Sequence, residues 1–217
     1  MYICCMTFRE FYQLMLPFVV FSNEDIVGVF GEFDRRRLYE WSQKGYIHPL
    51  TKGHYVFEEY RHDKNLGLLI SNKIYAPSYV SLEFVMSMHG LIPEAVYTYT
   101  AVSTKKTTHF ATSLGDYSYK SIKPSLYKGY ELHKVEIPRR GQIETRYVKV
   151  ATPEKALFDF LYYRRGLMDE AKLPELRFDI DILSSLNSAS LNNYIKLSGR
   201  KDIAFNLDNI LKHYVIT

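Results

Sequence analysis

Apolar residues recur at helical spacing near the start of the chain, and four of them share one face of a predicted helix: Phe8, Phe11, Tyr12 and Met15. A second helix is predicted to begin after Ser22, whose hydroxyl can form a capping box with Asp25. Gly31 ends this helix and permits a sharp turn. A third helix is predicted from its N-cap Asp34 up to Gly45, which ends it.

A β-hairpin is predicted directly after the third helix. Residues 46–50 and 54–57 favour strands, and Thr51-Lys52-Gly53 suits the turn between them. Pro49 fits an exposed edge better than a central strand. Two helices joined by a tight turn and followed by a hairpin are the elements of a winged helix-turn-helix, a module that binds DNA.

The third helix is expected to present a polar face, because Leu38 and Trp41 share the opposite side. Outward Arg and Gln side chains can make bidentate contacts to base edges, and cations at the flanks of the helix suit phosphates. The residues expected to face bases are Arg36, Tyr39 and Gln43. Those expected to contact the DNA backbone are Arg35, Arg37 and Lys44, with Lys52 and His54 at the hairpin tip. The alternative is that three consecutive arginines merely solvate the start of a helix.

The rest of the chain predicts strands first and helices afterwards, which indicates an α+β domain. Helices are expected over residues 61–73, from a cap at Ser78 to Gly90, after the Thr152 cap, and over 176–186, 188–197 and 202–214. Strands are expected over 95–103, around the turn 114–116, and over 130–137 and 146–150. The fold class is thus α+β: a winged helix-turn-helix over residues 1–60, then a mixed α+β domain with a helical C-terminal tail over 61–217.

Charge is unevenly distributed along the 217 residues, although the formal net charge is only +4. Residues 1–60 contain six Lys/Arg and eight Asp/Glu, so only one face of the first domain suits DNA. Residues 101–155 contain eleven Lys/Arg and five Asp/Glu, which makes this segment a second candidate for contact with a polyanion, DNA or RNA. The residues expected to form this patch are Lys105, Lys106, Lys120, Lys123, Lys128, Arg139 and Arg140. A solvated surface is the alternative.

Cysteine usage and hydropathy bear on the compartment. The adjacent pair Cys4 and Cys5 provides no disulfide framework, which fits a reducing cytoplasm. The apolar run over residues 14–21 contains Pro17 and is too short to span a bilayer. No basic segment precedes a cleavable apolar stretch, so neither a signal peptide nor a membrane partner is expected.

The sequence offers little that would support catalysis. The seven histidines show no metal-ligand spacing, and no glycine-rich phosphate loop is present. Asp179 and Asp181 are two residues apart in a predicted helix and point in different directions. No nucleophile can be placed beside a base and an orienting group. We therefore expect no enzyme, no catalytic residue, no metal and no cofactor.

Three segments resemble AbiEi-type antitoxins of type IV toxin–antitoxin (abortive infection) systems. They are YAPSYVSLEFVMSMHGLIPEAVYTYTAVSTKKT (residues 75–107), SIKPSLYKGY (121–130) and ATPEKALFDFLYY (151–163). The order of a winged helix followed by an α+β domain is also similar to that family, and the resemblance covers roughly residues 8–163.

The resemblance implies an antitoxin that binds inverted repeats in its own promoter as a repressor and counteracts a nucleotidyltransferase-fold toxin without a stable complex. The operator would then be bound by residues 35–37 with Gln43 and Lys44. Two alternatives stay open: a DNA-binding regulator without an antitoxin role, and a protein-binding module that masks a toxin directly.

Overall fold

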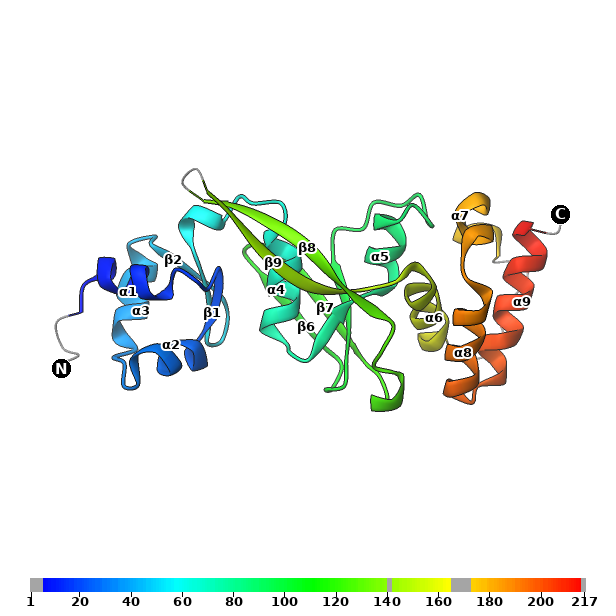
Figure 1. Cartoon of the computed structure of the whole chain (residues 1–217), viewed down its shortest axis with the longest axis horizontal. Helices are drawn as coiled ribbons and strands as arrows, with labels where there is room; N and C mark the ends of the chain where they lie inside the picture. The colour runs from blue at the N-terminus through cyan, green and yellow to red at the C-terminus, as the bar shows by residue number, and fades with distance from the viewer. Residues whose placement is uncertain (1–5, 140–141, 165–172, 216–217) are drawn as a thin grey trace.

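The computed structural model describes residues 6–139, 142–164 and 173–215. Within them the chain is a mixed α+β protein with two β-sheets, so the predicted α+β class is confirmed. The molecule is elongated, with the N-terminal helices at one end, the larger sheet in the middle and the C-terminal helices at the other end (Figure 1). No helix in the described part of the chain is long and apolar enough to cross a membrane.

The N-terminal part contains the predicted helices and hairpin. These elements are α1 (Phe8–Met15), α2 (Asn23–Phe30), α3 (Arg36–Gln43), β2 (Ile47–Thr51) and β3 (His54–Phe57). The predicted capping box of Ser22 and Asp25 is present, and Gly31 ends α2 with φ 72°, a conformation that glycine adopts without strain. An additional strand, β1 (Val20–Ser22), overlaps the end of the apolar run and pairs antiparallel with β3, which gives the order β1-β3-β2.

Aromatic side chains fill the interior of this part. Phe11 is fully buried and its ring centroid lies 4.6 Å from that of Trp41 and 5.8 Å from that of Phe21. The same apolar cluster continues into the rest of the chain and includes the buried Tyr117 and Tyr119. The N-terminal elements are therefore packed directly against the larger sheet.

The larger sheet has six strands in the order β6-β7-β5-β4-β9-β8. The strands are β4 (Ser78–Val80), β5 (Tyr99–Ser103), β6 (Thr108–Thr112), β7 (Gly115–Ser121), β8 (Tyr130–Arg139) and β9 (Gln142–Ala151). Neighbouring residues of β5 belong to different apolar clusters, because Ala101 joins the N-terminal cluster and Val102 joins the other. This is the alternation of side chains that a strand buried on both faces produces.

Helices cover both faces of this sheet. On one face lies α4 (Leu66–Ile74), and on the other lie α5 (Leu82–Met88) and α6 (Pro153–Tyr163). Three C-terminal helices, α7 (Ile180–Ser185), α8 (Ser188–Ser198) and α9 (Lys201–Val215), lie beyond α6 at the end of the molecule (Figure 1). The short 3-10 turns are η2 (Glu58–Tyr60), η3 (Pro124–Leu126) and η5 (Pro174–Leu176). The Thr152 hydroxyl caps α6 as predicted, by accepting from the Lys155 amide.

Several boundaries differ from the predictions. Ser78 is not a helix cap: it begins β4, and Ser81 precedes α5, because residues 78–80 pair with β5 on one side and Val80 pairs with β9 on the other. The strand predicted from residue 95 begins at Tyr99, the helix predicted from 61 begins at Leu66, and the one predicted from 176 begins at Ile180. Each element is shorter because tertiary pairing and packing override local preference.

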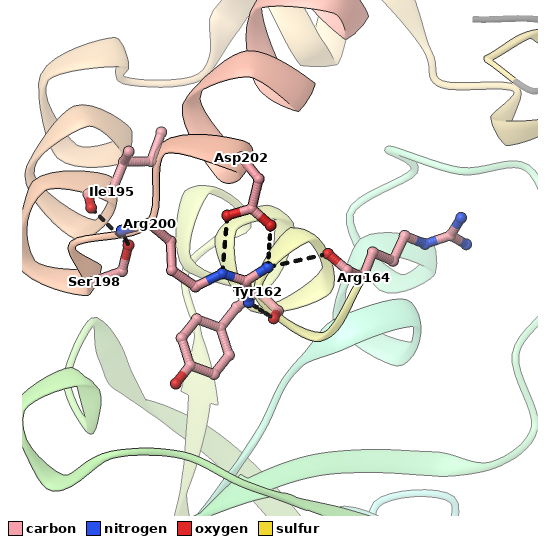
Figure 2. A network of polar contacts seen from close by, with 6 residues as sticks. All are labelled: Tyr162, Arg164, Ile195, Ser198, Arg200 and Asp202. Carbon is pink, nitrogen blue, oxygen red and sulfur yellow. Dashed lines mark hydrogen bonds and ion pairs between the residues drawn. The ribbon is translucent and has the colours of Figure 1, made fainter. Parts of the chain in front are cut away.

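Arg200 holds the C-terminal tail to the end of α6 (Figure 2). Its Nε donates to Asp202 Oδ1 at 3.0 Å, and its Nη2 donates to Asp202 Oδ2 and to the Arg164 carbonyl. Its Nη1 donates to the Tyr162 carbonyl, and the guanidinium lies 5.3 Å from the centre of the Tyr162 ring. The Ser198 hydroxyl accepts from the Arg200 amide at 3.1 Å. The two bonds to the Tyr162 and Arg164 carbonyls satisfy groups that the end of α6 leaves without partners.

Candidate nucleic-acid interface

The orientation of α3 is set by the side chains that it buries. Leu38 and Trp41 are 2% and 4% exposed, and the Trp41 ring lies 5.4 Å from that of Phe8. Burial of these two side chains leaves the opposite face of α3 in solvent. The two sides of the helix are thus the ones that the helical wheel predicts.

The exposed face of α3 carries most of the predicted DNA contacts. Tyr39 is 69% exposed, and Arg36 and Gln43 are also exposed. Arg35 and Lys44, at the two ends of the helix, are exposed as well. Their accessibility satisfies the first requirement of an interface, whereas the contact with DNA stays a prediction.

Arg37 differs from the other two arginines. It is half-buried, and its guanidinium donates to the main-chain carbonyl of Met6, so it ties the segment before α1 to α3. The start of the helix also differs by one residue, since Arg35 occupies the N-cap position predicted for Asp34. The Asp34 carboxylate nevertheless accepts from the Arg36 amide at 3.0 Å and so fixes the first turn.

The hairpin places Lys52 and His54 at its tip, as predicted. Lys52 is exposed, whereas His54 is half-buried and shares a 3.0 Å hydrogen bond between its Nδ1 and the Thr51 hydroxyl. Burial lowers the pKa of His54, and the nearby charge of Lys73 lowers it further. His54 is therefore uncharged near neutral pH and can contribute a hydrogen bond to an anion but no charge.

The residues of the predicted patch in the second domain come from several elements. Lys105 and Lys106 follow β5, and the Ser121 amide donates to the Thr107 hydroxyl at 3.0 Å, which brings this loop beside the end of β7. The other predicted lysines, Lys120, Lys123 and Lys128, are exposed. Arg139 ends β8, ten residues in length, so its backbone lies roughly 30 Å from the start of that strand near Lys128. Arg140 lies outside the described residues, and a common surface of these residues stays a prediction.

The buried polar group that the sequence analysis missed lies under α6. Lys155 and Asp159 are fully buried and form an ion pair, and Asp159 also accepts from the Tyr79 hydroxyl at 2.9 Å and the Ser81 hydroxyl at 2.7 Å. The signal was present, because the apolar residues of α6 lie on most of its sides, which indicates a helix buried nearly all round. Charges four residues apart on such a helix have to pair.

Neither this cluster nor the surface pockets offer a clear reaction centre. Lys155 and Asp159 do not line the four pockets that are best formed among the described residues. A pocket of about 480 Å³ is lined by Ser121, Tyr162 and Tyr163 together with Arg200 and Asp202, but the guanidinium there is bonded within the chain. Among the described residues, no three His, Cys, Asp or Glu side chains come together as a metal site would require.

No protein-family model matches the chain, and a search of curated proteins finds no relative of it.

Proposed function

We propose that the N-terminal elements form a winged helix-turn-helix and that the protein is a DNA-binding regulator. The observation that supports this most strongly is the exposed face of α3, with Arg36, Tyr39 and Gln43 opposite a fully packed core. A helix placed in a major groove needs such a face, because bases are distinguished by bidentate contacts from side chains of this type. The hairpin β2–β3 supplies the wing.

The proposal is tested by binding to the DNA upstream of the protein's own gene, measured across a salt series. Arg36→Ala is expected to lose about 1–3 kcal/mol on the specific site and to lose discrimination against scrambled DNA. The matched control is Arg9→Ala, which removes an exposed arginine from α1. If wild type binds specific and scrambled DNA equally, the regulator function is refuted. If Arg36→Ala weakens both DNAs by the same factor, Arg36 contacts the backbone and not the bases.

We further propose that the protein is an antitoxin of the AbiEi type, which represses its own promoter and counteracts a nucleotidyltransferase-fold toxin. This half rests on the resemblance carried by residues 75–107, 121–130 and 151–163. Those segments correspond to β4 through β5, the η3 loop, and α6 with its buried ion pair. They lie outside the N-terminal elements, so DNA binding and antitoxicity can be separated by mutation.

Co-expression with the neighbouring toxin gene tests the second half. Rescue of growth by wild type and by Arg36→Ala alike would support antitoxicity independent of DNA binding. Failure of wild type to rescue growth would leave a regulator without an antitoxin role. A stoichiometric complex on co-purification would instead favour direct masking of the toxin.

A further inference from the structure

A pocket of about 290 Å³ lies where the hairpin tip meets the rest of the chain. One wall is formed by Lys52, Gly53 and His54 of the hairpin with the start of α2. The other wall is formed by the end of α4, including Lys73, and by Lys105 from the loop after β5. Residues far apart in the sequence are thus brought to one cavity.

Three of the residues that line this pocket are lysines, and each comes from a different element. Lys52, Lys73 and Lys105 line it with one carboxylate, Glu24, and Lys73 is also paired with Asp25, so the group carries an excess of one positive charge. Like charges gathered in one cavity repel one another, and the repulsion is strongest where water is partly excluded. A bound anion would compensate this charge.

The walls of the pocket are fixed by local contacts. The Asn23 amide donates to the Gly53 carbonyl at 2.9 Å, and a Cβ atom at Gly53 would lie 2.8 Å from Asn23 Nδ2, so the hairpin tip packs closely on the start of α2. Lys73 Nζ lies 2.7 Å from Asp25 Oδ2, and Asp25 also accepts from the Ser22 amide. The ammonium group of Lys73 is therefore held in place before any ligand arrives.

Lys105 has no comparable anchor among the contacts that the structure describes. Its Nζ lies 5.4 Å from the centre of the Tyr75 ring, a cation–π contact that leaves the ammonium hydrogens available to an acceptor. His54, neutral near pH 7, adds a hydrogen-bonding group without further repulsion. The pocket thus combines preformed positive charge with donors, which is the chemistry that recognises phosphate.

We propose that this pocket binds a phosphate group, and that in the cell the phosphate belongs to the DNA backbone beside the wing. The choice of DNA as the source rests on the proposed function. The chemistry of the pocket would equally accept a free phosphate or a phosphorylated small molecule, and the experiment separates these sources.

The test compares Lys105→Gln with Lys64→Gln, a matched change at an exposed lysine outside the pocket. Loss of one phosphate contact lowers the slope of log K against log salt concentration by about 0.9. We expect Lys105→Gln to lower the slope by that amount and to weaken specific and scrambled DNA equally, while Lys64→Gln matches wild type. An additional variant, Lys106→Gln, tests the neighbouring lysine, which does not line the pocket.

The second arm uses inorganic phosphate at constant ionic strength and follows the ring signals of His54 by NMR. Phosphate is expected to shift these signals in wild type and to shift them less in Lys105→Gln. If wild type fails to bind DNA specifically but shows this shift, the proposed function fails and the pocket binds a phosphate from another source.

Three outcomes overturn the proposal that this pocket binds phosphate. Normal DNA binding by Lys105→Gln with no effect of phosphate on His54 refutes it and leaves the DNA-binding function intact. If Lys106→Gln lowers the slope of log K against log salt concentration as much as Lys105→Gln does, the contact belongs to the wider basic surface and not to the pocket. Absence of both specific DNA binding and a phosphate shift in wild type refutes the pocket and the proposed function together.

Discussion

The buried ion pair of α6 allows a quantitative test of how this fold is held together. Lys155 and Asp159 have no exposed surface, and the Lys155 Nζ lies 4.8 Å from the centre of the Phe158 ring and 5.3 Å from that of Tyr79. Replacing Lys155 by Met leaves a buried carboxylate with only two neutral hydroxyl donors. Removal of one partner of a buried pair costs about 3–5 kcal/mol, so Lys155→Met and Asp159→Leu are each expected to destabilise by at least that amount.

The double variant Lys155→Met/Asp159→Leu is expected to be no less stable than either single variant. Burial lowers the pKa of Lys155 and raises that of Asp159, and the attraction between the two groups only partly opposes this. The desolvation cost therefore exceeds the attraction, and removing both charges removes both costs. What remains is the loss of an acceptor for Tyr79 and Ser81, about 1–3 kcal/mol for each hydroxyl left unbonded.

Urea denaturation at pH 7 measures these differences as a double-mutant cycle. The matched control is Asp208 and Lys212, an ion pair with the same spacing on α9 whose side chains are more than half exposed. Its single alanine variants are expected to lie within about 1 kcal/mol of wild type. Single Lys155 or Asp159 variants that lose less than about 1 kcal/mol, or a cycle without coupling, would refute the reasoning.

Three further predictions concern other parts of the fold. Arg200→Lys is expected to cost about 1–3 kcal/mol and to increase amide exchange at the start of α9, because an ammonium cannot reproduce the planar fork that reaches a carboxylate and two carbonyls. Gly129→Ala is expected to cost about 2–4 kcal/mol, since φ is +79° and a Cβ would lie 2.4 Å from the Tyr194 hydroxyl; addition of Tyr194→Phe should restore part of the loss. Burial lowers the pKa of His54 and of His89, so the folded state binds fewer protons than the unfolded chain just below pH 6.5. Melting temperature should therefore fall between pH 7.5 and 5.5, and His89→Gln should reduce this fall, whereas a rise on acidification would contradict the assignment.

Local signals predicted the N-terminal elements well because they act between residues close in sequence. The capping box of Ser22 with Asp25 and the end of α2 at Gly31 both depend on backbone groups within a few positions. The helical wheel of α3 was reliable for a similar reason, since Leu38 and Trp41 had to share the buried side. The missed strand β1 has no such signal, because its three residues are a strand only through pairing with β3.

The predicted anion patch shows the limit of charge counted along a sequence. Counting grouped Arg139 with Lys128, but the ten-residue strand β8 separates these two residues. Conversely, Lys73 belonged to no predicted binding surface, although it lines one pocket with Lys105. Separation along the sequence does not show which charged residues lie close together, because strands that reverse direction bring distant residues into contact.

The sequence by itself determined the α+β class, the caps at Ser22 and Thr152, and the buried and polar faces of α3. These features follow from backbone hydrogen bonding and side-chain periodicity, which operate over a few residues. Only the tertiary structure decided that Lys155 and Asp159 are buried together, that Arg37 is bonded to the Met6 carbonyl, and that three lysines meet at the hairpin tip. Those outcomes depend on burial and on contacts between distant elements. The electrostatic energy of a charged side chain depends on its exposure to water and on the neighbouring charges, and both are fixed only in the folded chain.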